Sequence, residues 1–268
     1  MASTFLHSGC LGDLLYALPT IKAFQTGDLR LCDRPWTKAL LGRHPAIVPL
    51  LKAQGCIADV SVYSNGDPID HDLSTFRSGG LKYGDTVIER QARWVGAKAE
   101  ISQPWLTVKE PSQRTKGKIV VNRCERWPGF HFPWKDLVHI FGSDMIFVGL
   151  VSEHKEFCRE FGEIKYAPTA NLLEVSALIS GAELFIGNQS CPLAIAEGLH
   201  KRTIVEICCF AADCFHRRPG NVHCVDGGMS FEALGKHFES PSMGEVGNEM
   251  EVNLMNRAKA FRDHGATQ

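Results

Sequence analysis

The sequence lacks an excess of either charge and lacks any long apolar run. Its 268 residues carry 29 basic and 30 acidic side chains, so the formal net charge is -1. A wholly basic surface is therefore excluded, and any nucleic-acid contact must be confined to a patch. No run approaches the roughly 18 apolar residues of a membrane span. Residues 1–14 have no basic stretch leading into a long apolar run, so we expect no signal peptide and a cytoplasmic protein. Peripheral contact with a membrane surface stays open.

The ten cysteines lack the spacing of a zinc knuckle or a redox dithiol, because no pair fits C-x-x-C. Several lie in apolar segments such as 207–210, where a thiol packs as a small hydrophobic group. We therefore expect reduced thiols. A metal site formed by Cys208, Cys209, Cys214 and His216 is the weaker alternative, because its spacing is irregular.

Segments with strand and helix patterns alternate along the chain. Such alternation predicts parallel sheets joined by crossover helices. Pro19 predicts a kink or a restart in the first helix. Strands are expected at 4–7, 29–32, 60–63, 118–122, 145–150, 183–187 and 203–208, and helices at 12–24, 37–41, 48–54, 85–95, 135–141, 154–161, 172–179, 192–199 and 250–262. A long polar loop, with room for one short strand, fills 64–83.

A polar stretch at 110–118 divides this pattern in two and is typical of a linker. We expect an α/β fold of two Rossmann-like domains with parallel sheets, at 1–112 and 113–240, followed by a tail helix in 241–268. Ligands bind beyond the carboxyl ends of strands in open parallel sheets, so a cleft between the domains is the expected site.

The first strand–turn–helix junction carries a candidate base. Gly9 and Gly12 bracket the turn after Ser8, and glycine lets a ligand approach the main chain. Asp13 falls in the first helical turn, where the helix dipole favours a carboxylate. This carboxylate could accept a proton from a substrate hydroxyl. The alternative is that Asp13 only caps the helix and that the glycines only form the turn.

The second candidate site lies where an apolar strand ends in Asn188 and Gln189. Ser190 or Asn188 suits the N-cap of the next helix, and Pro192 suits its first turn, beside Cys191. The free N–H groups of a helix start favour a phosphate. An ordinary capped helix is the alternative.

A basic and aromatic cluster follows the first strand of the second half. Arg123 and Arg126 could clamp a pyrophosphate, because a guanidinium matches its oxygens. Trp127, Phe130 and His131 are candidates for stacking on a base or sugar. The alternative is a solvated loop with packed aromatic side chains.

Together these segments resemble glycosyltransferase family 9, the ADP-heptose lipopolysaccharide heptosyltransferases and their relatives. The resemblance spans most of residues 3–210. It is carried by Gly9-x-x-Gly12-Asp13 with Pro19, by 118–122 running on to 126–128 and Trp134, and by 172–198.

The resemblance implies a GT-B fold, with the acceptor bound mainly by the first domain and a nucleotide-diphosphate sugar mainly by the second. It implies an inverting, metal-independent transfer in which the nucleotide sugar is a co-substrate and no cofactor is held. Asp13 would be the general base. Ser190 and Cys191, with Arg123 or Arg126, would stabilise the departing diphosphate.

The donor turn departs from the family pattern, in which an acidic residue precedes Ser or Thr, Gly and Pro, with His two positions on. Here Gln189, Cys191 and Ala194 stand at the acidic, glycine and histidine positions. Another donor, such as a UDP-sugar, and loss of activity therefore both stay open. Glu197 is one turn further along and is expected to contact the nucleotide ribose or to face solvent.

The leading hypothesis is transfer to a hydroxyl of a glycan. The first alternative is a bacteriophage-type enzyme acting on hydroxymethylated DNA bases, for which the candidate patch is Arg34, Trp36, Arg77, Lys82, Arg90, Arg93 and Trp94. The second is a non-catalytic nucleotide-sugar-binding protein. A dinucleotide-dependent oxidoreductase is disfavoured, because neither half has a G-x-G-x-x-G turn with an acidic residue about 20 positions on.

Overall fold

The computed structural model describes residues 2–33, 41–78, 86–129, 132–208, 213–216, 218 and 221–225. The tail helix expected in 241–268 lies outside the described residues, as does the helix expected at 37–41 except for residue 41. So do Phe130, His131 and Cys209. The domain limits at 112 and 240 stay predictions.

The N-terminal half is built on a four-stranded parallel sheet, confirming the sheet type expected for it. Its strand order is β3-β2-β1-β4. The strands are β1 (Ser3–His7), β2 (Gly27–Leu31), β3 (Ile57–Val62) and β4 (His71–Asp72). The helices are α1 (Leu11–Ala23), α2 (His44–Lys52) and α3 (Val87–Trp94), with 3-10 turns η1 (Leu41–Arg43) and η2 (Leu73–Ser78). The restart considered at Pro19 does not occur, because α1 is one element.

The C-terminal half has a six-stranded parallel sheet with the order β10-β9-β8-β5-β6-β7. Its strands are β5 (Ile119–Asn122), β6 (Met145–Phe147), β7 (Lys165–Tyr166), β8 (Leu184–Asn188), β9 (Thr203–Ile207) and β10 (Val222–Val225). Its helices are α4 (Trp134–Phe141), α5 (Val151–Phe161), α6 (Leu172–Gly181) and α7 (Cys191–Gly198), with turns η3 (Gln113–Thr115) and η4 (Gly142–Asp144). The sequence pattern missed β7 and β10, because these short edge strands carry polar residues and no apolar run.

The alternation of side chains decides which sheet face is covered. Phe5, Leu29, Leu31 and Val60 share one face of the N-terminal sheet and are buried in one cluster with α1 and α2. Residues on the other face are largely polar, as shown by Arg30, which pairs there with both Asp28 and Asp59. In this half the apolar core therefore lies between one sheet face and its helices.

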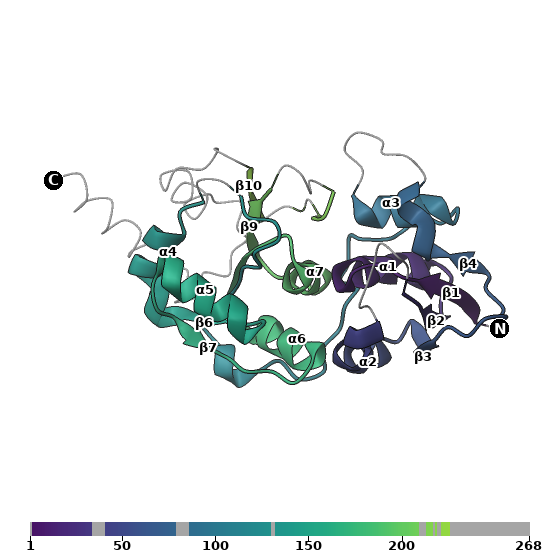
Figure 1. Ribbon diagram of the computed structural model, residues 1–268, viewed down its shortest axis with the longest axis horizontal. Helices are drawn as coiled ribbons and strands as arrows, with labels where there is room; N and C mark the ends of the chain where they lie inside the picture. The colour runs from purple at the N-terminus through teal and green to yellow at the C-terminus, as the bar shows by residue number, and fades with distance from the viewer. Residues whose placement is uncertain are drawn as a thin grey trace.

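The two halves lie side by side, and α1 and α7 meet between them (Figure 1). A Cβ placed on Gly12 would lie 3.9 Å from the Cα of Cys191 and from the Cβ of Ala194. Gly12 and Cys191 both belong to the first turn of their helices. The starts of the two helices therefore pack against each other.

A buried hydrogen bond joins the halves one turn further along. The hydroxyl of Tyr16 on α1 donates to Glu197 Oε2 on α7 at 2.6 Å, and the backbone amide of His216 donates to Oε1 at 2.8 Å. Glu197 has no exposed surface. The expectation that it faces solvent is wrong, because α7 packs into the contact between the halves. Burial raises the pKa of its carboxyl to about 8.

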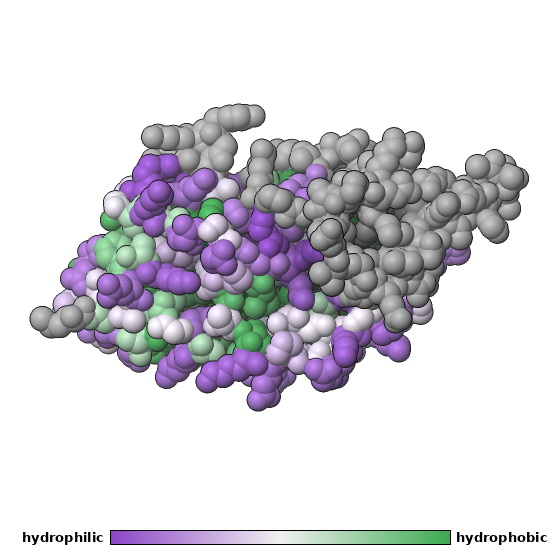
Figure 2. All heavy atoms as spheres, turned by 180° about the vertical axis from the view of Figure 1, so that it is seen from behind, coloured by the Kyte–Doolittle hydropathy of each residue, from purple (hydrophilic) through white to green (hydrophobic). Residues whose placement is uncertain are grey.

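The surface seen from behind is mostly hydrophilic, with smaller apolar areas between (Figure 2). Large exposed apolar side chains among the described residues are Val62, Trp94, Leu150 and Val151. No helix in the described part of the chain is long and apolar enough to cross a membrane. The eight described cysteines with placed side chains are free thiols.

We expect Glu197→Gln to remove a pH dependence of stability. The folded pKa of about 8 lies above the ordinary 4.5, so the folded protein keeps a proton that the unfolded chain releases. The free energy of unfolding of the native protein therefore falls as pH rises through that window. Glutamine does not titrate, so this fall should shrink by a few kcal/mol in urea unfolding at the two ends of the window.

Glu110→Gln is the matched control, because Glu110 is exposed in the segment between the halves. An equal fall in stability for native protein and Glu197→Gln would contradict the assignment of the buried proton to Glu197.

Candidate active site

The strand order places a switch point in each sheet. The chain moves from β1 to β2 and β3, then returns to β4 on the other side of β1. Likewise it moves from β5 to β6 and β7, then returns to β8 on the other side of β5. Crevices for ligands form where the strand order reverses. Asp13 lies in the first turn of α1, which follows β1, and Arg77 lies in η2, which follows β4. Arg126 and Ser190 lie in the loops after β5 and β8. The segments that carry these four residues therefore all lie beside a switch point.

Asp13 is held close to the turn that precedes its helix. A Cβ on Gly9 would lie 2.8 Å from the Cβ of Asp13 and 2.5 Å from His7 Cε1. The Gly9 amide donates to His7 Nδ1 at 2.9 Å. Ser8 is fully buried, and its hydroxyl donates to the carbonyl of Ser74 at 3.4 Å. The sequence pattern predicted Gly9 for the turn and for the approach of a ligand. The structure adds a further reason, which is its close packing against His7 and Asp13.

His7 is a neutral imidazole under the site. It has no exposed surface, and burial, assisted by the charge of Arg77, lowers its pKa to about 3. Because Nδ1 accepts from Gly9, the ring proton belongs on Nε2. That buried nitrogen has no hydrogen-bond partner within the described structure.

An arginine–aspartate network holds the Asp13 carboxylate. Arg77 Nη2 donates to Asp13 Oδ1 at 2.9 Å, and Arg77 Nη1 donates to Asp213 at 2.9 Å. Arg90 Nη1 donates to the same Asp213 oxygen at 2.8 Å. The carbonyl of Asp213 also accepts from the amide of Val87 at the start of α3. Asp213 comes from the C-terminal half, so this network spans both halves.

The surroundings of Asp13 raise the pKa of its carboxyl group and so make its carboxylate a stronger base. Burial raises the pKa of its carboxyl, the charge and hydrogen bond of Arg77 lower it, and the charge of Asp213 raises it. The net direction is upward. A carboxylate with a raised pKa takes a proton from a hydroxyl more readily than an ordinary one.

The start of α7 is not capped by a side chain. Ser190 is the N-cap, but its hydroxyl donates to Asn122 Oδ1 at 2.7 Å instead of bonding the helix. Pro192 lies in the first turn, as expected, and has no N–H. Burial raises the pKa of the Cys191 thiol to about 12, so the thiol stays neutral. The helix start therefore retains the backbone N–H groups that an anion binds.

Like Arg43, Arg126 is a cation whose charge acts on Cys191 at this helix start. Its Nη1 lies 3.6 Å from the sulfur of Cys10, which directly precedes α1, and its guanidinium lies over the Trp127 ring. Arg126 therefore reaches from the C-terminal half to the N-terminal half. Arg123 differs, because it pairs with Glu206 at 3.0 Å and with Glu160 at 3.4 Å. The observed pairing disfavours Arg123 as a diphosphate clamp.

Two predicted donor residues hold the loop and strand in place. The Asn188 amide donates to the carbonyls of Cys124 and Trp127 and accepts from the Cys124 amide. Gln189 Oε1 accepts from the amide of Cys208 at 2.7 Å. Both side chains are buried. Their contacts shape the crevice, and direct donor binding by these side chains stays a prediction.

Three of the four described members of the patch considered for DNA are held by other groups of the protein. Arg77 and Arg90 pair with Asp13 and Asp213, and the Trp94 indole donates to the carbonyl of Asp72. Arg34, Trp36 and Lys82 lie outside the described residues. Within the described ranges, no group of three or more His, Cys, Asp or Glu side chains could hold a metal ion.

Sequence reasoning missed three residues of this arrangement. Tyr16 follows Asp13 by three positions on the same helix, so its spacing could have placed it on the same face. Arg77 was considered only for the DNA patch, and nothing in its polar surroundings marks it. Asp213 lies 200 positions beyond Asp13, and no sequence signal connects the two.

Several solved structures with a similar architecture are heptosyltransferases or family 9 glycosyltransferases. The E. coli heptosyltransferase WaaC, in a structure with ADP-2-deoxy-2-fluoro heptose, matches with a TM-score of 0.62 at 11% identity, over 89% of this chain and 99% of its own. A family 9 glycosyltransferase from Veillonella parvula DSM 2008 matches at 0.56 and 12%, over 97% and 96%. The E. coli ADP-heptose LPS heptosyltransferase II matches at 0.50 and 12%, over 100% of both chains.

No protein-family model matches the sequence, and no curated protein matches it. The structural likeness nevertheless defines the class of fold: two all-parallel α/β sheets arranged as in GT-B proteins. Within that class, the architecture is that of family 9 heptosyltransferases, at low sequence identity. The resemblance expected from the motifs is thus confirmed as a likeness of fold.

We expect Gly9→Ala to destabilise the protein by about 1–3 kcal/mol, because the added methyl overlaps His7 and Asp13. Gly55→Ala is the control, since a Cβ there meets nothing within 4 Å. Urea unfolding of both variants gives the comparison. Equal stability of the two variants would show that the turn at Gly9 has more space than its contacts indicate.

Proposed function

We propose that this protein is an inverting glycosyltransferase that moves a sugar from a nucleotide-diphosphate sugar to an acceptor hydroxyl. One observation carries the proposal. The carboxylate of Asp13 lies at the switch point of one sheet, and the uncapped start of α7 lies at the switch point of the other, with Gly12 packed against Cys191. A base and an anion site are therefore neighbours across the contact between the halves.

Asp13 activates the acceptor hydroxyl. Its carboxylate removes the proton of the acceptor hydroxyl as the oxygen attacks the anomeric carbon. The bond from that carbon to the diphosphate breaks on the opposite face, which inverts the configuration. The raised pKa of Asp13 supports this role, because proton transfer from a hydroxyl needs a strong base.

The departure of the diphosphate depends on groups that stabilise its negative charge. The starts of α1 and α7 both bring the positive ends of helix dipoles to this place. Arg126 adds a cation beside Cys10. Fixed dipoles and cations aimed at developing negative charge contribute strongly to catalysis. The structure with WaaC contains ADP-2-deoxy-2-fluoro heptose, and by analogy we propose a nucleoside diphosphate as the leaving group. No metal ion is part of this proposal.

A carbohydrate acceptor is favoured over a hydroxymethylated DNA base. Two of the three described arginines of the DNA patch, Arg77 and Arg90, are paired with carboxylates instead. A non-catalytic nucleotide-sugar-binding protein is the second candidate. It would have no use for a buried carboxylate beside the anion site, and the Asp13 variant below distinguishes the two.

We expect Asp13→Asn to lower transfer by about 10²–10⁴-fold while nucleotide-sugar binding persists. Asparagine has a similar shape and retains an acceptor for Arg77 but cannot take the proton. Thermal shift with a panel of ADP-, UDP- and GDP-sugars identifies the donor, because a ligand at 100 times its dissociation constant stabilises the fold by about 2.7 kcal/mol. Mass spectrometry of the acceptor then measures transfer.

Asp59→Asn is the matched control, because Asp59 lies on β3 and pairs with Arg30 away from the site. Transfer by Asp13→Asn at the native rate would show that Asp13 is not the general base. Binding of a nucleotide sugar without any transfer or hydrolysis by the native protein would favour the binding protein.

We expect Arg77→Gln and Asp213→Asn to shift the pH profile of kcat/KM in opposite directions. Arg77 lowers the pKa of Asp13 and Asp213 raises it. The base must be deprotonated, so losing Arg77 should move the acidic limb to higher pH and losing Asp213 should move it to lower pH. Shifts of the same sign, or unshifted profiles with lower kcat alone, would contradict a positioning role for Arg77.

A further inference from the structure

The connection from β3 to β4 contains no helix. Residues 63–70 cross from one side of β1 to the other in turns and extended chain. Crossovers between parallel strands usually carry a helix that covers the sheet. A cavity of about 600 Å³ lies in this region, lined by described residues from all four strands or their ends and from the connection itself. This volume is within the usual range of small-molecule sites.

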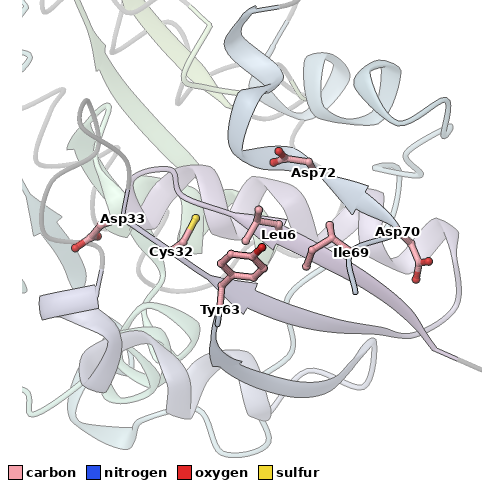
Figure 3. A pocket seen from close by; sticks show the side chains of 7 residues that line it. All are labelled: Leu6, Cys32, Asp33, Tyr63, Ile69, Asp70 and Asp72. Carbon is pink, nitrogen blue, oxygen red and sulfur yellow. The ribbon is translucent and has the colours of Figure 1, made fainter. Parts of the chain in front are cut away.

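The cavity lies on the sheet face opposite α1 and α2. Leu6 pairs with Arg30 and with Asp72 in register, and it alternates with Phe5 and His7, which point to the covered face. Figure 3 shows the side chains of Leu6, Tyr63 and Ile69 gathered in the middle of the cavity. They form an apolar and aromatic floor, against which the C–H face of a sugar ring can pack.

Three carboxylates surround this floor. In Figure 3, Asp33 and Asp70 lie toward its two ends, and Asp72 lies above it. A backbone amide fixes each one: Leu41 donates to Asp33 at 3.0 Å, Thr4 to Asp70 at 2.8 Å and Ser74 to Asp72 at 2.8 Å. Held in this way, they are preorganised acceptors for hydroxyl or ammonium groups.

The charge of the lining selects against anions. Its described residues include three aspartates and no lysine or arginine. A phosphate or carboxylate in this cavity would face like charges, which costs free energy. Hydroxyl and ammonium groups donate hydrogen bonds to carboxylates without that cost.

A short path links the cavity to Asp13. Asp72 accepts from Ser74, and the carbonyl of Ser74 accepts from the buried hydroxyl of Ser8. Ser8 directly precedes Gly9, against which the Asp13 side chain packs. The cavity is therefore connected to the turn that precedes α1, the helix that carries the proposed base.

We propose that this cavity binds a carbohydrate that carries no phosphate or carboxylate group, as the acceptor of the transfer. The role of this sugar as acceptor rests on the proposed function, whereas its binding to the cavity does not. Tyr63 supplies the packing surface and the three aspartates determine selectivity. Specificity then comes from the charge of the cavity as well as from its shape.

The test measures sugar binding in the absence of any donor. Ligand-observed NMR titrations use a panel of neutral sugars and amino sugars, including maltose and glucosamine, beside glucose 6-phosphate and glucuronic acid. We expect neutral and amino sugars to bind and the anionic ones not to bind. Tyr63→Ala should weaken binding about tenfold, whereas Tyr63→Phe should retain it.

Replacing Asp33 and Asp70 together by Asn preserves acceptors for the amides of Leu41 and Thr4 while removing two charges. This variant should lose selectivity against glucose 6-phosphate. Asp59→Asn, with the same chemical change outside the cavity, should retain it. Circular dichroism and thermal unfolding confirm that each variant is folded.

The proposal is overturned if no neutral or amino sugar of the panel binds in a Tyr63-dependent way, or if glucose 6-phosphate binds the native cavity as tightly as maltose. Sugar binding without transfer from any nucleotide sugar would refute the proposed function while leaving this site intact.

Discussion

The packing of α1 against α7 is the contact on which the rest of the site depends. Gly12 and Cys191 bring the first turns of the two helices together, and Tyr16 reaches Glu197 one turn further along. Each helix follows the central strand of a switch point, so their contact also aligns the two crevices. A different packing of these helices would separate the proposed base from the proposed anion site.

This contact buries charged groups, and the structure compensates for each of them. Glu197 has two hydrogen-bond donors and a pKa raised to about 8, so it can be neutral when buried. Asp13 has Arg77 as its ionic partner. Tyr16 reaches Glu197 from the opposite half, and Asp213 of the C-terminal half pairs with Arg77, the partner of Asp13. The contacts that join the two halves therefore also determine the surroundings of the Asp13 and Glu197 carboxyl groups.

The N-terminal sheet uses its two faces differently. One face is covered by α1 and α2 and forms the core. The other is polar and carries the cavity beside the crossover at 63–70, which extends from Asp33 beyond the carboxyl end of β2 to Asp70 before the amino end of β4. Because the side chains of a strand alternate between faces, Leu6 contributes to the cavity while its neighbour His7 supports the turn of Asp13. A single strand thus positions both the acceptor side and the base.

The sequence by itself determined the parallel α/β architecture, the turn before Asp13 and the helix start at Ser190, because these depend on local periodicity, glycine and capping. Only the tertiary structure decided which side chains meet. Arg123 and Arg126 look alike in sequence, yet Glu206 and Glu160 pair with one and Cys10 lies near the other. Glu197 was expected at the ribose or in solvent, and Arg77 in a DNA patch. Their partners lie far apart in the chain, and contacts across such distances are set by how the two sheets pack.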